Sequence, residues 1–109
     1  MEPSNQIWIG LAEVAALEGC RRLGDSKGAS VNVVAWANSE PDFRSRVRKV
    51  VAELDLKLLD LEDCEPFSKR QAQWEVDDVI LQMVDTANEE HNRNNVVFGT
   101  FHLWKKADA

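Results

Sequence analysis

The stretch from residue 30 to residue 63 constrains the fold most, because a helix pattern lies there between two strand patterns. Residues 30–37 alternate with period two and are rich in β-branched side chains, which predicts a strand. Residues 56–63 return to a strand pattern. The helix between them is indicated by an apolar stripe made of Phe43, Val47, Val50, Val51 and Leu54. A strand, a crossover helix and a second strand favour parallel neighbours joined right-handedly.

The start of this helix is marked by the run Ser39-Glu40-Pro41-Asp42. The Ser39 side chain can accept a hydrogen bond from a backbone N–H of the first turn. Pro41 is tolerated where no intrahelical N–H is needed, and Asp42 carries the charge that the positive helix end favours. We therefore predict Ser39 as the N-cap.

The flanking segments complete the predicted set of elements. Residues 7–14 alternate and predict a first strand, and residues 96–104 predict a last one. Residues 15–28 favour a β-hairpin connection; a crossover helix there, giving an all-parallel β-α-β-α arrangement, is the alternative. A second helix is predicted from the apolar stripe of Val76, Val79, Ile80, Met83, Val84 and Ala87.

Together these elements predict one α+β domain over residues 1–109. We expect a two-layer sandwich: a mixed four-stranded sheet with element order β-β-α-β-α-β and two helices on one face. In architecture alone this resembles the ferredoxin-like two-layer plaits, and such a resemblance implies a fold and no function.

Charge is distributed unevenly along the chain. The net charge of −6 argues against nucleic acid as a partner, because phosphate binding needs a basic surface. From residue 21 to residue 49 seven basic residues stand against three acidic ones; from residue 53 to residue 90 twelve acidic residues stand against three basic ones. The acidic half could steer a basic partner protein.

No stretch approaches the roughly 18 apolar residues of a membrane helix. The N-terminal MEPSNQ lacks the basic and apolar segments of a secretory signal, so we expect a cytoplasmic location without membrane contact.

Metal and cofactor sites are not indicated. Cys20 and Cys64 lie outside any CxxC or Cys/His spacing, so both are expected to be reduced thiols. The acidic residues Glu62, Asp63 and Glu65 could hold a hard cation, but they lack the Asp-x-Asp-x-Asp-Gly loop pattern. We expect this cluster to be the solvated end of a strand. No cofactor is expected.

Comparing strand faces yields the candidate site. If both helices cover the aliphatic face, most tryptophans lie on the opposite, uncovered face, which then suits a flat ligand or a dimer mate. The residues expected on this ligand or dimer face are Trp8, Asn32, Trp36, Phe98, Thr100, His102 and Trp104.

Three classes of function are compatible with these features. The first is a binding module, expected to form a homodimer through the aromatic face. The second is an acidic inhibitor or immunity-type protein for a basic partner. The third is a small dimeric enzyme with a site on the sheet face, where His102, Asn32 and Thr100 are the polar groups to test. No nucleophile or carboxylate is tied to His102 by spacing, so no catalytic residue is assigned.

Overall fold

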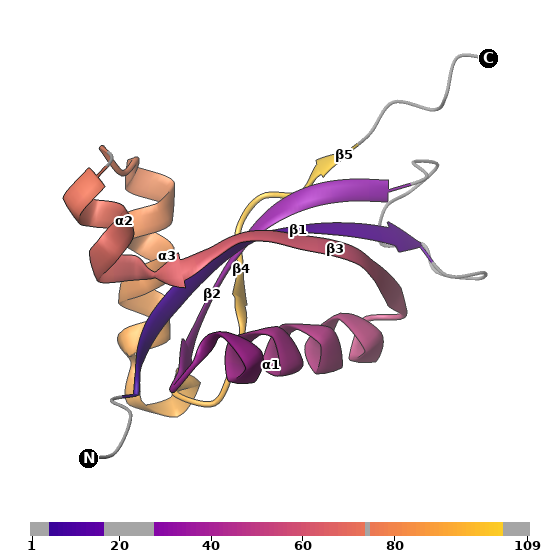
Figure 1. Cartoon of the computed structure of the whole chain (residues 1–109). Coiled ribbons are helices and arrows are strands. Elements are labelled where there is room, and N and C mark those ends of the chain that lie inside the picture. The colour runs from indigo at the N-terminus through magenta and orange to yellow at the C-terminus, as the bar shows by residue number, and fades with distance from the viewer. Residues whose placement is uncertain (1–4, 17–27, 74, 104–109) are drawn as a thin grey trace.

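The computed structural model describes residues 5–16, 28–73 and 75–103. Their elements are β1 (Gln6–Ala16), β2 (Gly28–Ala37), α1 (Glu40–Glu53), β3 (Leu56–Pro66), α2 (Phe67–Gln73), α3 (Asp78–Asn88), the 3-10 helix η1 (Glu90–Asn92), β4 (Val97–Phe98) and β5 (His102–Leu103). Figure 1 shows α1 below the strands and the α2–α3 pair at one end of the sheet.

The sheet has the order β3-β1-β2-β4, and β5 also pairs with β2. Every described pair is antiparallel, so the predicted mixed sheet is wrong. The prediction failed because β1 lies between β2 and β3. The helix α1 does connect two strands that run in the same direction, but these strands are not neighbours.

The antiparallel pairing of β1 with β2 is the pairing that a β-hairpin makes, and it excludes the all-parallel alternative. The connecting residues 17–27 lie outside the described part of the chain.

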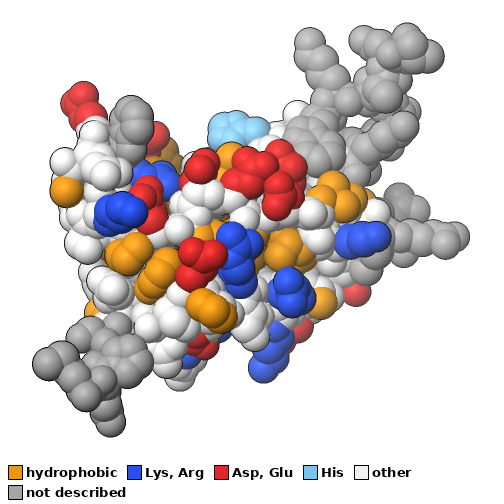
Figure 2. All heavy atoms as spheres, in the orientation of Figure 1, with side chains coloured by type: hydrophobic (Ala, Val, Ile, Leu, Met, Phe, Trp, Pro, Cys, Tyr) orange, Lys and Arg blue, Asp and Glu red, His pale blue; other side chains and the backbone are white. Residues whose placement is uncertain are grey.

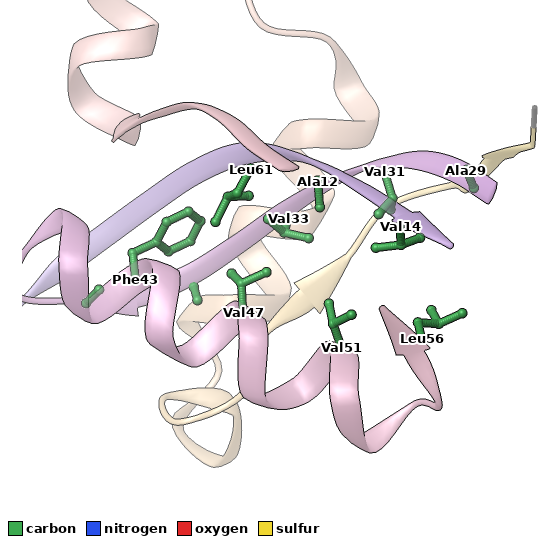
Figure 3. Packing of buried hydrophobic residues seen from close by; sticks show 12 residues of the cluster. Ala12, Val14, Ala29, Val31, Val33, Phe43, Val47, Val51, Leu56 and Leu61 are labelled. Carbon is green, nitrogen blue, oxygen red and sulfur yellow. The ribbon is translucent and has the colours of Figure 1, made fainter. Parts of the chain in front are cut away.

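The predicted N-cap is confirmed: the Ser39 hydroxyl accepts a hydrogen bond of 3.2 Å from the backbone N–H of Asp42. Helix α1 buries Phe43, Val47 and Val51. Figure 3 shows these side chains pointing at Ala12, Val14, Val31, Val33 and Leu61 on one face of the sheet.

The two main helices lie on opposite faces of the sheet, so the prediction of both helices on one face is wrong. A second apolar cluster, separate from that of α1, contains Ile80, Met83 and Ala87 of α3 packed with Ile9 and Val34. The physical reason is that β1 and β2 are apolar on both sides near one end, where Val33 faces α1 and Val34 faces α3. With an all-antiparallel sheet covered from both sides, the fold is α+β and the ferredoxin-like topology is not confirmed.

The last predicted strand is interrupted. It forms two strands of two residues each, and between them the Gly99 N–H donates to the Asn32 carbonyl at 2.9 Å. A Cβ on Gly99 would come within 2.9 Å of the Met83 sulfur, so glycine lets this segment pass close under α3.

Candidate functional site

The predicted aromatic face does not exist as a single surface. Trp8 pairs with Ala35 across the β1–β2 ladder, and Trp36 pairs with Ile7. Because neighbouring residues of a strand point to opposite faces, Trp8 lies on the α1 side of the sheet and Trp36 on the α3 side. The Trp8 ring stacks on Phe43 with centroids 6.2 Å apart, inside the cluster that sequence patterns assigned to the other face.

Phe98 is also on the α1 side, since it pairs with Val33 and packs on the same cluster. Asn32 shares the α3 side with Trp36, and the remaining predicted residue Trp104 lies outside the described part. The indole Nε1 of Trp36 donates to the Ala87 carbonyl at 2.9 Å, and the Arg93 guanidinium lies 4.3 Å from the ring centroid. The Trp36 side chain is thus engaged within the chain.

The polar candidates at the last strands are exposed. His102 pairs with Ser30, which places it on the α3 side of the sheet, two residues along β2 from Asn32. Thr100 is exposed between β4 and β5. The structure therefore puts His102 and Asn32 on one face, and a catalytic role for either stays a prediction.

Helices α2 and α3 cover only part of their face of the sheet. Along β1, Ala12 and Val14 are fully buried under α1, whereas Leu11, Glu13 and Ala15 on the opposite side are only half-buried. We name this open part the carboxylate face; it consists of Leu11, Glu13, Ser30, Asp60, Glu62 and His102.

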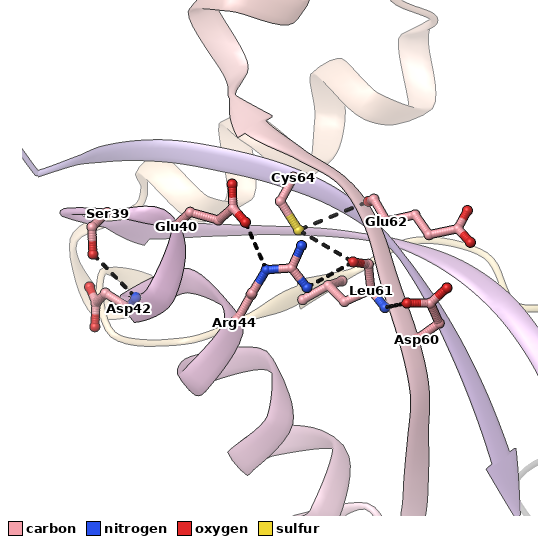
Figure 4. Close-up of polar contacts among 8 residues, drawn as sticks. All are labelled: Ser39, Glu40, Asp42, Arg44, Asp60, Leu61, Glu62 and Cys64. Atoms are coloured by element: carbon pink, nitrogen blue, oxygen red, sulfur yellow. Dashed lines mark hydrogen bonds and ion pairs between the residues drawn. The ribbon is translucent and has the colours of Figure 1, made fainter.

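Three acidic side chains meet on this face. Glu13 pairs with Asp60, and Leu11 pairs with Glu62, so Asp60 lies directly opposite Glu13 and Glu62 lies diagonally across from it. A carboxylate oxygen of each lies within 4.8 Å of the others. In Figure 4 the side chains of Asp60 and Glu62 point away from Arg44, on the far side of β3, and Figure 2 shows acidic side chains gathered above β3.

Within the described residues, none of these three carboxylates forms an ion pair with a basic side chain, although the charge of Asp60 interacts at longer range with that of Arg44. A hydrogen bond with Asp60, together with the charges of Asp60 and Glu13, raises the pKa of Glu62 above its ordinary value. A cation placed here would lower the repulsion.

The acidic group suggested by sequence was Glu62, Asp63 and Glu65, and only Glu62 belongs to the cluster. Glu13 and Asp60 were missed because they are 47 residues apart in sequence and meet only through the β1–β3 register. A bulge also shifts that register between Ile9 and Leu11, which alternation along β3 does not reveal.

As a metal site the cluster is sparse. Ca²⁺ takes about six to eight oxygen ligands, and three exposed or half-exposed carboxylates on a sheet surface supply only part of that set. Cys64, a free thiol on β3, lies outside this cluster, and burial raises the pKa of its thiol.

The outer edge of β3 is closed by arginines. The Arg44 guanidinium donates to the Leu61 carbonyl at 2.9 Å (Figure 4). The Arg70 guanidinium donates to the Asp63 carbonyl at 3.1 Å. Glu40 forms an ion pair with Arg44 and holds its guanidinium in place. The hydrogen bond from Arg44 to Glu40 raises the pKa of Arg44. Side chains in these positions hinder strand addition at the edge.

No protein-family model, curated protein or solved structure matches this chain. Among the described residues, no helix combines the length and apolar character that a bilayer crossing requires.

Proposed function

We propose that this protein is an interaction module that binds a basic partner protein through the carboxylate face. The observation that carries this proposal is the convergence of Glu13, Asp60 and Glu62 on an open sheet surface without a basic side chain of the described chain to pair with them. A lysine or arginine from a partner would supply the missing charge.

Two further features support a protein partner. The net charge of −6 favours encounter with a basic surface at long range. The half-buried Leu11 lies between Glu62 and Asn32 in the register, so an apolar contact is available next to the charges. Interfaces of this kind combine an apolar centre with a charged rim.

The aromatic surface proposed for a homodimer gains no support from this arrangement, because Trp8 and Trp36 pack in opposite interiors. Homodimer formation itself stays a prediction, and sedimentation equilibrium measures it directly.

Calorimetric titration with an oligolysine peptide of about eight residues tests the carboxylate face. We expect binding that weakens as salt rises from about 0.01 M to about 1 M, where the screening length falls from ~30 Å to ~3 Å. The triple variant Glu13→Gln, Asp60→Asn, Glu62→Gln should bind about tenfold more weakly, since each exposed ion pair contributes up to about 1 kcal/mol.

The matched control removes three exposed carboxylates elsewhere: Glu53→Gln, Asp85→Asn and Glu90→Gln. This control has the same net charge as the triple variant. At a screening length of ~8 Å, charges outside the carboxylate face act weakly on a peptide bound there, so we expect the control to bind it within about twofold of the wild type. Equal losses in the two variants would show that total charge alone attracts the peptide, and the proposal would then be wrong.

A further inference from the structure

A cavity of about 510 Å³ lies between the sheet and the α2–α3 pair, next to the carboxylate face. Small-molecule sites in proteins have volumes of roughly 300–1,000 Å³. Asn32 lines this cavity and also borders the carboxylate face through its pairing with Leu11. The cavity is formed by different side chains from those of the acidic cluster.

The floor of the cavity is apolar, whereas most of its accessible lining is polar. Ile9 of β1 and Ile80 of α3 line it and are almost fully buried, and Val76 contributes from the segment before α3. Asn32 contributes an uncharged polar side chain to the lining. An apolar floor beneath polar walls suits a compact organic molecule that carries a polar group.

The rim carries an excess of negative charge, with four carboxylates against two basic groups: Asp63, Glu65, Glu75 and Asp77 against Lys69 and Arg70. The basic group of Arg70 is already used, because it forms an ion pair with Glu65 and donates to the Asp63 carbonyl. One oxygen of Asp77 accepts from the Ile80 N–H at 3.0 Å, which caps α3. Lys69 is then the other basic residue of the lining, against Asp63, Glu75 and Asp77.

Asp63 reaches this rim through an irregular backbone. It has φ of 54°, a left-handed conformation that side chains other than glycine rarely adopt, and it lies in the bulge of β3 opposite Gly10. A bulge redirects a side chain that regular alternation would place elsewhere. Asp63 lines the cavity, whereas its neighbour Glu62 does not.

We propose that this cavity binds a small organic cation, a primary amine carried by a short apolar body. The ammonium group lies at the rim near Asp63 and Asp77, the apolar body contacts Ile9 and Ile80, and the Asn32 amide fixes its orientation. This site goes beyond the proposed partner surface and does not depend on it.

Titration with three probes of the same size tests the chemistry: phenethylamine, phenethyl alcohol and phenylacetate. The readout is the NMR signal of the Asn32 side-chain amide. We expect phenethylamine to shift this signal with a dissociation constant of about 1 mM, as a ligand of so few atoms allows. The alcohol should bind at least about tenfold more weakly, and the acid should not bind. Equal binding of amine and alcohol, or no shift with the amine, overturns the proposal.

Two variants locate the ammonium group. Asp63→Asn removes the charge and keeps a residue that tolerates left-handed backbone, so the fold is retained and affinity should fall about fivefold. Asp78→Asn, in the first turn of α3 but outside the cavity lining, is the matched control and should leave affinity unchanged. The triple variant of the carboxylate face should bind the amine as the wild type does. A comparable loss in that variant or in Asp78→Asn would place the amine elsewhere and overturn the proposal.

Discussion

Trp8 and Trp36 lie on opposite faces of the same sheet, and their indole N–H groups differ in hydrogen bonding. Nε1 of Trp36 donates to the Ala87 carbonyl at 2.9 Å, whereas the buried Nε1 of Trp8 has no hydrogen-bond partner among the described residues. The first contact joins β2 to the end of α3. The Trp8 N–H is a desolvated donor beside Phe43, and burying it costs free energy.

This difference predicts unequal responses to the same substitution. Trp36→Phe keeps an aromatic ring but removes the hydrogen bond and leaves the Ala87 carbonyl without this donor. It should therefore lower the free energy of unfolding by about 1–3 kcal/mol. Trp8→Phe loses ring volume but also removes the unsatisfied donor, so its cost should be smaller. Urea unfolding of both variants measures the two losses, and a larger loss for Trp8→Phe would contradict this prediction.

The closed edge of β3 predicts a change in association state. Arg44→Met keeps much of the side-chain stem but frees the Leu61 carbonyl at an edge strand. We expect a loss of about 1 kcal/mol in unfolding free energy and a rise in self-association, measured by sedimentation velocity. The control is Arg48→Met, which removes the same charge from α1 but no hydrogen bond to β3, and should stay at the wild-type sedimentation coefficient. Matching behaviour of the two variants would refute the role of the edge.

The carboxylate cluster predicts a pH-dependent gain in stability. The pKa of Glu62 is raised in the folded state, so its contribution to stability is fully present below its unfolded pKa and is lost as pH rises through the folded value. Glu62→Gln should therefore raise the melting temperature at about pH 7 and have little effect at about pH 3, where the carboxyl is protonated in both states. Calorimetric melting at both values measures the effect. A gain of the same size at both would mean that repulsion is not its cause.

Local elements could be predicted from sequence because their causes are local. The N-cap at Ser39 follows from one hydroxyl and one amide three residues apart, and the stripe of Phe43, Val47 and Val51 follows from helical periodicity. The antiparallel pairing of β1 with β2 could likewise be predicted from the sequence. The stripe of α3 was predicted less well: Val79 is 50% exposed, because its position on the helix turns away from the sheet.

The sequence by itself determined the first three strands, helix α1 and most of helix α3, and that the chain carries excess negative charge. Only the tertiary structure decided which faces are covered and which side chains meet. Consecutive apolar residues such as Val33 and Val34 allow burial on either side, so periodicity cannot say where a second helix packs. Glu13 and Asp60 become neighbours only because β1 inserts between β2 and β3, and strand order depends on packing of the whole chain rather than on any local pattern.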